Sequence, residues 1–119
     1  MLELGAVAAQ IGTAYLLCPE STTSRVHRAA LDGEGARHTE ITNLFTGRPA
    51  RGIVNRVMRE LGPLRPDVPE FPLAAEAIAP LRAKAEEQGR GDFSPLWAGQ
   101  NVSGCRNVPA GDITREFAE

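Results

Sequence analysis

Four consecutive residues near the N-terminus, Gln10-Ile11-Gly12-Thr13, are of types that can hold an anion. They stand where a short apolar segment gives way to a loop. At such a point a glycine lets the backbone approach an anion closely, and main-chain N–H groups and a threonine hydroxyl can donate to phosphate oxygens. The motif is short, however. From its chemistry alone, an ordinary turn is the simpler interpretation of these four residues.

The other residue types that usually carry chemistry form no recognisable arrangement. His27 and His38 have no Cys, Asp or Glu partner at metal-ligand spacing, and no Ser/His/Asp or Cys/His arrangement can be placed around them. We therefore predict no metal site and no catalytic residue, and expect both histidines to be surface or capping residues. Cys18 and Cys105 are isolated, which indicates neither a zinc site nor a disulfide framework.

Four arginines, Arg48, Arg51, Arg56 and Arg59, form the main basic cluster and are expected to share one helix. They could bind an anion or a nucleic acid, but neighbouring acidic residues dilute the cluster, and a solvated or salt-bridged face is the simpler interpretation. The 13 basic and 15 acidic residues give a net charge of −2, which provides no general attraction to nucleic acids. We predict no nucleic-acid partner.

The chain is also expected to be cytoplasmic and to have no membrane partner. No apolar run approaches the roughly 20 residues that a membrane span needs. The first five residues lack the basic region of a secretion signal. Two isolated cysteines are typical of a reducing compartment.

The anion-binding motif needs a buried segment to position it, and residues 6–11 are the candidate. They are nearly continuously apolar with small side chains, and lie between Gly5 and Gly12. Helix propensity alone favours a helix for this Ala-rich segment. Its short length favours instead a strand buried on both faces, as in parallel sheets. Gly5 is expected to end a helix that includes residues 2–4.

The next part of the chain predicts a helix, a loop and a strand. Capping residues at 20–24 indicate a helix that continues to about Leu31. Residues 32–37 are glycine-rich and predict a loop. Residues 39–45 alternate well enough for a short strand that is rich in β-forming residues.

A second helix is expected to follow a turn at residues 46–49, with Pro49 in its first helical turn. An apolar stripe at four-residue spacing defines its buried face, and Gly62-Pro63 ends it. The stripe consists of Ile53, Val57 and Leu61.

The C-terminal half predicts a connector and two more helices. Prolines recur every third residue between Pro63 and Pro72, the repeat of an extended polyproline II strap. Leu73–Gln88 has a clear helical pattern, which Pro80 is expected to kink or divide. Asp112 is expected to cap a short last helix over residues 113–118.

Longer blocks of the sequence resemble a known family. Residues 5–21, GAVAAQIGTAYLLCPES, resemble the G-A-x-x-x-Q-x-G-T-x-x-L-x-x-x-E-S signature of nitronate monooxygenases. The resemblance continues through residues 41–64, ITNLFTGRPARGIVNRVMRELGPL, and residues 93–100, FSPLWAGQ. Flavin-dependent enoyl-ACP reductases share a similar Q-x-G-T and A-G-Q pair. The block FTGRPARGIVNR favours the nitronate enzymes over them.

The resemblance implies an FMN-dependent TIM-barrel oxidoreductase that oxidises alkyl nitronates with O2. The residues that match the family's FMN-phosphate strand end are Gln10, Ile11, Gly12 and Thr13. Gly99 and Gln100 match a returning loop near the flavin, and the nearby Trp97 is placed to form a pocket wall. In this family the catalytic His precedes the Q-x-G-T strand. No catalytic residue is therefore expected within this chain.

The implied fold class is α/β: the C-terminal part of an FMN-binding TIM barrel, with its last strand and closing helix, and a smaller α/β domain, mostly helical overall. Residues 1–19 would form the last barrel strand and the phosphate-binding turn. Residues 20–92 would form the smaller domain with its Pro-rich strap. Residues 93–119 would return to the barrel as a loop and closing helix.

A complete barrel of this type takes about 250 residues, so the resemblance implies an incomplete C-terminal portion with little activity in isolation. Two alternatives stay open. One is a truncated, cofactor-free α-rich module that self-associates through the unpaired strand at residues 6–11. The other is a fragment of an enzyme similar to the flavin-dependent enoyl-ACP reductases.

Overall fold

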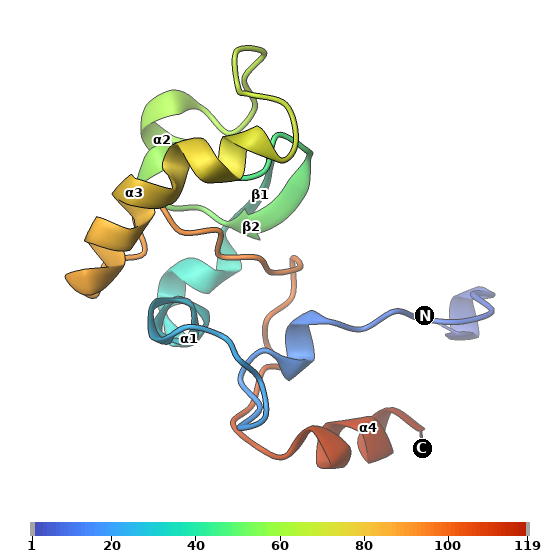
Figure 1. The fold of residues 1–119 in the computed structure, drawn as a ribbon. Coiled ribbons are helices and arrows are strands. Elements are labelled where there is room, and N and C mark those ends of the chain that lie inside the picture. Colours follow the sequence, from blue (N-terminus) through green and yellow to red (C-terminus); the bar gives the residue numbers. More distant parts are fainter. Residues whose placement is uncertain (1, 119) are drawn as a thin grey trace.

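The computed structural model describes residues 2–118. Residues 1 and 119, with which the first and last predicted parts of the chain begin and end, lie outside the described residues. Within that range the protein is a small α/β unit. Its α-helices are α1 (Arg25–Asp32), α2 (Arg56–Leu61), α3 (Leu73–Glu87) and α4 (Ala110–Ala118), and its strands are β1 (Thr39–Thr42) and β2 (Ala50–Ile53). Figure 1 shows the sheet, α2 and α3 at one end, and both termini with α4 at the other.

The two strands form an antiparallel hairpin with Thr39 opposite Ile53 and Thr42 opposite Ala50. A third segment runs beside β2 on its other edge. Ile53 donates its N–H to Leu96 O at 2.8 Å, and Ala98 donates to Arg51 O at 3.2 Å. Residues 96–98 therefore return to the hairpin from the far end of the chain.

The predicted second helix begins later than expected, and this part of the prediction is wrong. Residues 50–53 form β2, and α2 starts only at Arg56. The physical reason is that the main chain of β2 forms hydrogen bonds on both edges. A helix that began earlier would break these bonds. The four-residue apolar spacing was thus misleading, because Ile53 packs from a strand and Val57 from a helix. Leu61 is half exposed. Gly62 ends the helix as predicted, with φ of +81°.

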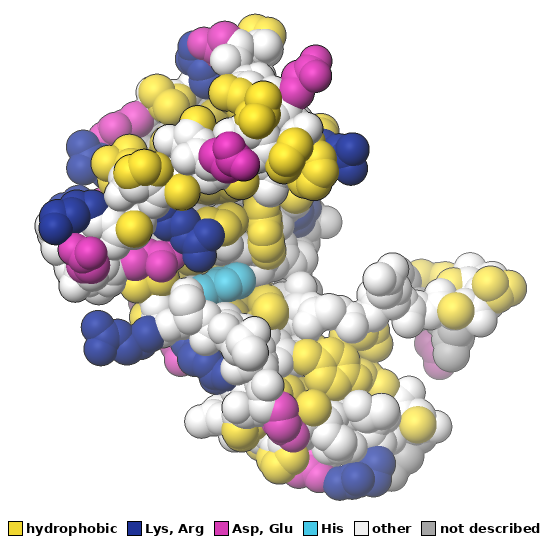
Figure 2. Space-filling view, in the orientation of Figure 1, with side chains coloured by type: hydrophobic (Ala, Val, Ile, Leu, Met, Phe, Trp, Pro, Cys, Tyr) yellow, Lys and Arg dark blue, Asp and Glu magenta, His cyan; other side chains and the backbone are white. Residues whose placement is uncertain are grey.

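The predicted strand at residues 6–11 is also absent. These residues have no regular secondary structure and are exposed, with Val7 fully so. We call residues 2–12 the arm, which Figures 1 and 2 show projecting away from the rest of the molecule. A strand buried on both faces needs neighbours on both edges, and no strand among residues 2–118 pairs with the arm. Gly5, with φ of +88°, ends a 3₁₀ turn at Leu2–Leu4, in agreement with its predicted helix-ending role.

The predicted helices at α1 and α3 are confirmed. Ser24 caps α1 by accepting a hydrogen bond from His27 N–H at 3.3 Å. The α3 helix continues through Pro80 as one element rather than two. The predicted loop over residues 32–37 contains a short 3₁₀ helix at Glu34–Arg37.

The last helix is longer than predicted, and its cap is different. Asp112 lies inside the first turn of α4 and pairs with Arg115. The carboxylate of Glu20, far away in sequence, accepts the Ala110 N–H at 3.0 and 3.2 Å. A negative charge at that position also suits the positive end of the helix dipole.

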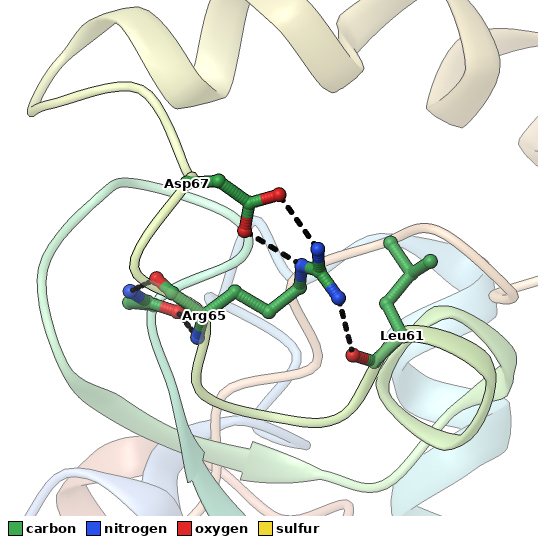
Figure 3. Close-up of polar contacts among 4 residues, drawn as sticks. Leu61, Arg65 and Asp67 are labelled. Atoms are coloured by element: carbon green, nitrogen blue, oxygen red, sulfur yellow. Dashed lines mark hydrogen bonds and ion pairs between the residues drawn. The ribbon is translucent and has the colours of Figure 1, made fainter.

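The proline-rich connector is folded rather than fully extended. The side-chain amide of Asn43 makes two hydrogen bonds with the main chain of Arg65, at 2.7 and 3.1 Å. Figure 3 shows the Arg65 guanidinium donating to both Asp67 carboxylate oxygens, at 2.8 and 2.6 Å, and to Leu61 O at 3.2 Å. These bonds turn the connector back onto the hairpin, so a continuous polyproline II strap does not form.

The buried side chains gather in three clusters. The first joins α1 to β2 and the returning segment, and includes Leu31, Ile53 and Leu96. The second lies between the hairpin turn and α2, around Phe45 and Met58. The third lies between α4 and the turn that follows the arm. It consists of Ala14, Cys18 and Ile113. Within residues 2–118, no helix has the length and apolar character that crossing a membrane requires.

Candidate functional site

The candidate site is centred on a hydrogen bond between two residues that are 86 positions apart in sequence. The main-chain N–H of Gly99 donates to the hydroxyl oxygen of Thr13 at 2.9 Å. A Cβ at position 99 would lie 3.3 Å from that oxygen, so glycine allows the close approach. The Thr13 hydroxyl keeps its own hydrogen available for another acceptor.

Around this contact lies an open depression of about 400 Å³, which we call the Thr13–Gly99 depression. It is lined by Gly12, Thr13, Leu16, Arg51, Trp97, Ala98 and Gly99. Most of its wall is apolar, and its charged side chain is that of Arg51. A Cβ built on Gly12 meets nothing within 4 Å, so the backbone there is open to a ligand.

The structure brings together three of the six predicted cofactor-binding residues, Gly12, Thr13 and Gly99. Gln10 and Ile11 are exposed on the arm and do not line the depression. Gln100 is exposed and borders a different hollow, of about 620 Å³, between the end of α1 and residues 101–105. The two predicted sequence blocks therefore meet, but only through Gly12, Thr13 and Gly99.

The returning segment is held in place by His27. Its Nε2 lies 2.9 Å from the carbonyl oxygen of Trp97, and because a carbonyl can only accept, Nε2 carries the proton. Burial lowers the pKa of His27, and the hydrogen bond to Trp97 opposes that shift. The Trp97 ring in turn packs edge-on against Phe45, with ring centroids 5.6 Å apart. His27 is therefore neither the surface residue nor the capping residue that was predicted, because its partly buried ring holds the returning segment.

Arg28 holds the turn that follows Thr13 in place, a role that the sequence analysis missed. Its guanidinium donates to four carbonyl oxygens, at distances of 2.8 to 3.2 Å, which belong to Leu17, Cys18, Ser21 and Thr23. All four acceptors are main-chain atoms, so no side-chain pattern could have revealed them. The arrangement joins α1 to the whole segment between Thr13 and the helix.

Cys105 adds a second restraint on the same turn. Its thiol lies 3.1 Å from the carbonyl oxygen of Thr13. Burial, together with the nearby Asp32 and Cys18, raises the pKa of this thiol and keeps it protonated as a donor. Both cysteines are free.

The four predicted cluster arginines do not form one basic face. Arg48 stacks over the Phe71 ring at 4.2 Å, Arg56 pairs with Glu60 at 2.7 Å, and Arg59 points to Val54 O at 3.4 Å. Arg51 instead projects from β2 and lines the Thr13–Gly99 depression. The cluster is dispersed because the expected helix is replaced by a strand followed by a shorter helix.

Among residues 2–118, no three His, Cys, Asp or Glu side chains are grouped so that they could hold a metal ion. Neither histidine lines the depression. Within its described residues, the depression contains hydrogen-bond donors and one cation, but no titratable acid or base. The geometry suits the binding and orientation of an anionic ligand rather than proton transfer.

Comparison with known proteins gives consistent matches over nearly the whole chain. The family model described as nitronate monooxygenase matches residues 1–119. Nitronate monooxygenase from Pseudomonas aeruginosa is 40% identical over 119 residues, which cover 99% of this chain and 34% of that protein. Nitronate monooxygenase from Paraburkholderia phytofirmans is 38% identical over 118 residues, which cover 98% of this chain and 32% of that protein.

A solved structure is similar to this chain over nearly its whole length. Nitroalkane oxidase from Streptomyces ansochromogenes matches with a TM-score of 0.83 and 41% sequence identity. The match covers 98% of this chain and 33% of that chain. The present chain thus spans about a third of the length of the relatives that it matches.

Proposed function

This chain belongs to the nitronate monooxygenase family, and we propose that it carries the flavin-phosphate end of an FMN-dependent enzyme that oxidises alkyl nitronates with O2. The observation that carries the proposal is the hydrogen bond between Gly99 and Thr13. It joins the Q-x-G-T and A-G-Q blocks, which are the two blocks that the family resemblance connects to the flavin.

The donors at the Thr13–Gly99 depression fit the phosphate end of FMN. The Thr13 hydroxyl has a free hydrogen, the backbone at Gly12 is unobstructed, and Arg51 brings a positive charge. Phosphate is recognised by this combination of hydroxyl, backbone and guanidinium donors. The apolar wall formed by Leu16, Trp97 and Ala98 suits a less polar part of the same ligand.

Bound FMN would accept electrons from the nitronate and pass them to O2. The part played by the described residues is to bind and orient. Gly12 and Thr13 would hold the anionic end, while His27 and Arg28 keep the two segments of the depression in register. No general acid or base is assigned among the residues that line the depression.

We propose that residues 1–19 correspond to the segment that forms the last strand of a TIM barrel and its phosphate turn in the complete enzyme, although residues 6–11 form no strand in this chain. Residues 20–92 then correspond to the smaller α/β domain, and residues 93–119 to the returning loop and closing helix. The similarity to nitroalkane oxidase extends over 98% of this chain, so it includes nearly all of the arm. A cytoplasmic location is consistent with the two free cysteines.

Flavin binding tests the proposal directly. The purified chain is titrated with FMN while flavin fluorescence and visible absorbance are followed, and O2 consumption is measured with an alkyl nitronate. Thr13→Val removes the hydroxyl at nearly constant volume and is expected to weaken FMN binding. Thr46→Val is the matched control, because the Thr46 hydroxyl bonds only within its own turn. A native chain that neither binds FMN nor consumes O2 with a nitronate refutes the enzyme proposal for this chain.

A second candidate, self-association without a cofactor, is favoured by one observation. The arm exposes Leu4, Val7 and Ile11, and its main chain has no partner strand within the described residues. An extended apolar segment of this kind pairs readily with another chain. Sedimentation analysis of the native chain and of Val7→Lys separates the two candidates, because only self-association through the arm is lost in the variant.

A further inference from the structure

Arg51 is the charged side chain that lines the Thr13–Gly99 depression, and its guanidinium has no carboxylate partner among residues 2–118. Among residues 2–118, no Asp or Glu oxygen lies within 4.0 Å of its guanidinium, whereas Arg56 pairs with Glu60 at 2.7 Å and Arg65 with Asp67 at 2.6 Å. Its side-chain hydrogen bonds run from Nη1 alone, to the carbonyl and hydroxyl oxygens of Thr39 at 3.0 and 3.2 Å. Within the described chain, the donors on Nε and Nη2 have no protein acceptor.

The hairpin determines where this cation lies. Arg51 sits opposite Ile41 in the strand register, and its carbonyl accepts the N–H of Ala98. Its side chain is partly buried and lines the depression that also contains Thr13 and Gly99. Partial burial of a charge costs free energy unless an opposite charge or sufficient hydrogen bonds compensate for it. A bound anion would provide that compensation.

We propose that Arg51 is the positively charged contact for the anionic group held at the Thr13–Gly99 depression. This assignment rests on the proposed function, under which the anion is the phosphate of FMN. Thr13 and the main chain offer neutral donors, so Arg51 supplies the charge that distinguishes a phosphorylated flavin from riboflavin. The planar guanidinium can also present two parallel donors to one phosphate group.

The test compares two ligands in three proteins: the native chain, Arg51→Gln and Arg48→Gln. Arg48 is a matched control, because it lies three residues away, carries the same charge and stacks over Phe71 rather than lining the depression. FMN and riboflavin affinities are measured by quenching of flavin fluorescence. We expect Arg51→Gln to weaken FMN binding about 10- to 100-fold and to leave riboflavin affinity unchanged. Arg48→Gln is expected to change neither affinity.

A second measurement separates this inference from the FMN proposal. Inorganic phosphate is added to the ¹⁵N-labelled native chain, and the amide signals of Gly12, Thr13 and Gly99 are followed by NMR. We expect these signals to shift in the native chain and in Arg48→Gln, but not in Arg51→Gln. If circular dichroism shows that Arg51→Gln is unfolded, Arg51→Met replaces it, because Met preserves the apolar stem.

Each outcome decides the question. Unchanged FMN affinity in a folded Arg51 variant, or an equal loss of FMN and riboflavin affinity, overturns the assignment. Phosphate shifts that depend on Arg51, in a native chain that does not bind FMN, support the anion contact and overturn the FMN proposal. A native chain that binds neither FMN nor phosphate overturns both.

Discussion

Two extended segments of this chain, β2 and the arm, have opposite environments. Ile53 of β2 is buried, and the strand has hydrogen-bonded neighbours on both edges, in β1 and in residues 96–98. The arm is at least as apolar, yet Val7 is fully exposed and no strand among residues 2–118 pairs with it. An extended backbone is thus stabilised by its neighbours more than by its own residues. The candidate site lies where these two environments meet.

The largest expected contrast comes from shortening one apolar side chain in each region. Met58 is 1% exposed in the cluster between the hairpin turn and α2. Met58→Ala is expected to lower the free energy of unfolding by about 2–5 kcal/mol, because it leaves a cavity. Val7→Ala is expected to change it by less than about 0.5 kcal/mol. Urea denaturation measures both. A loss of several kcal/mol in Val7→Ala would show that the arm is packed in solution.

Glycines with positive φ give the next contrast. A Cβ on Gly47 would lie 2.6 Å from the backbone of Pro69 and Phe71, whereas a Cβ on Gly5 meets nothing within 4 Å. Both Ala substitutions force a left-handed conformation on an L-residue, but only Gly47→Ala adds a backbone clash. We expect about 2–4 kcal/mol of destabilisation for Gly47→Ala and no more than about 1 kcal/mol for Gly5→Ala. Equal losses in thermal or urea unfolding would contradict the comparison.

A substitution of Arg28 tests how strongly its hydrogen bonds stabilise residues 17–23, the turn between the arm and α1. Arg28→Met keeps the apolar stem but removes the donors to four carbonyl oxygens. We expect a loss of about 1–3 kcal/mol, because partly buried acceptors lose their partners. Amide hydrogen exchange should rise between residues 17 and 23 and remain low in β1 and β2. Arg25→Met, on an exposed position of the same helix, serves as the control.

The smallest effect is expected from pH. Burial lowers the pKa of His27 in the folded state below the value of about 6.5 for an unfolded histidine. The unfolded state therefore binds more protons as pH falls through 6.5, and the stability present above that pH is progressively lost below it. Urea midpoints at pH 7.5 and 5.5 should differ more for the native chain than for His27→Gln. His38→Gln makes the same substitution at an exposed position and is the control for the exchange of side chain.

Local signals in the sequence predicted the elements whose formation depends on near neighbours. The capping residues at 20–24 predicted α1, and the apolar spacing after Pro72 predicted α3. The α/β class was implied by the family resemblance. Thr13 and Gly99, which the same resemblance connected to the flavin, lie in contact.

What could not be predicted depends on distant partners. The strand at residues 50–53 exists because Leu96 and Ala98 return to its edge, and no pattern within β2 reveals that. The same residues carry an apolar spacing that also fits a helix, which led to the wrong interpretation. The cap of α4 by Glu20 and the carbonyl contacts of Arg28 likewise join positions that sequence spacing does not connect. Arg51 was named only as one of four clustered arginines, because it was assigned to a helix that does not begin there.

The hydrogen bond from Gly99 to Thr13 has a consequence for the order of folding. It closes a loop of 86 residues, and the entropic cost of joining chain ends grows with the length between them. The hairpin, whose partners are near in sequence, can form first and shorten the effective distance. We expect the candidate site to assemble last during refolding, and to open first when the native protein fluctuates. A ligand that binds across this contact would then stabilise it against local opening. It would slow the release of the returning segment more than it slows unfolding of the hairpin.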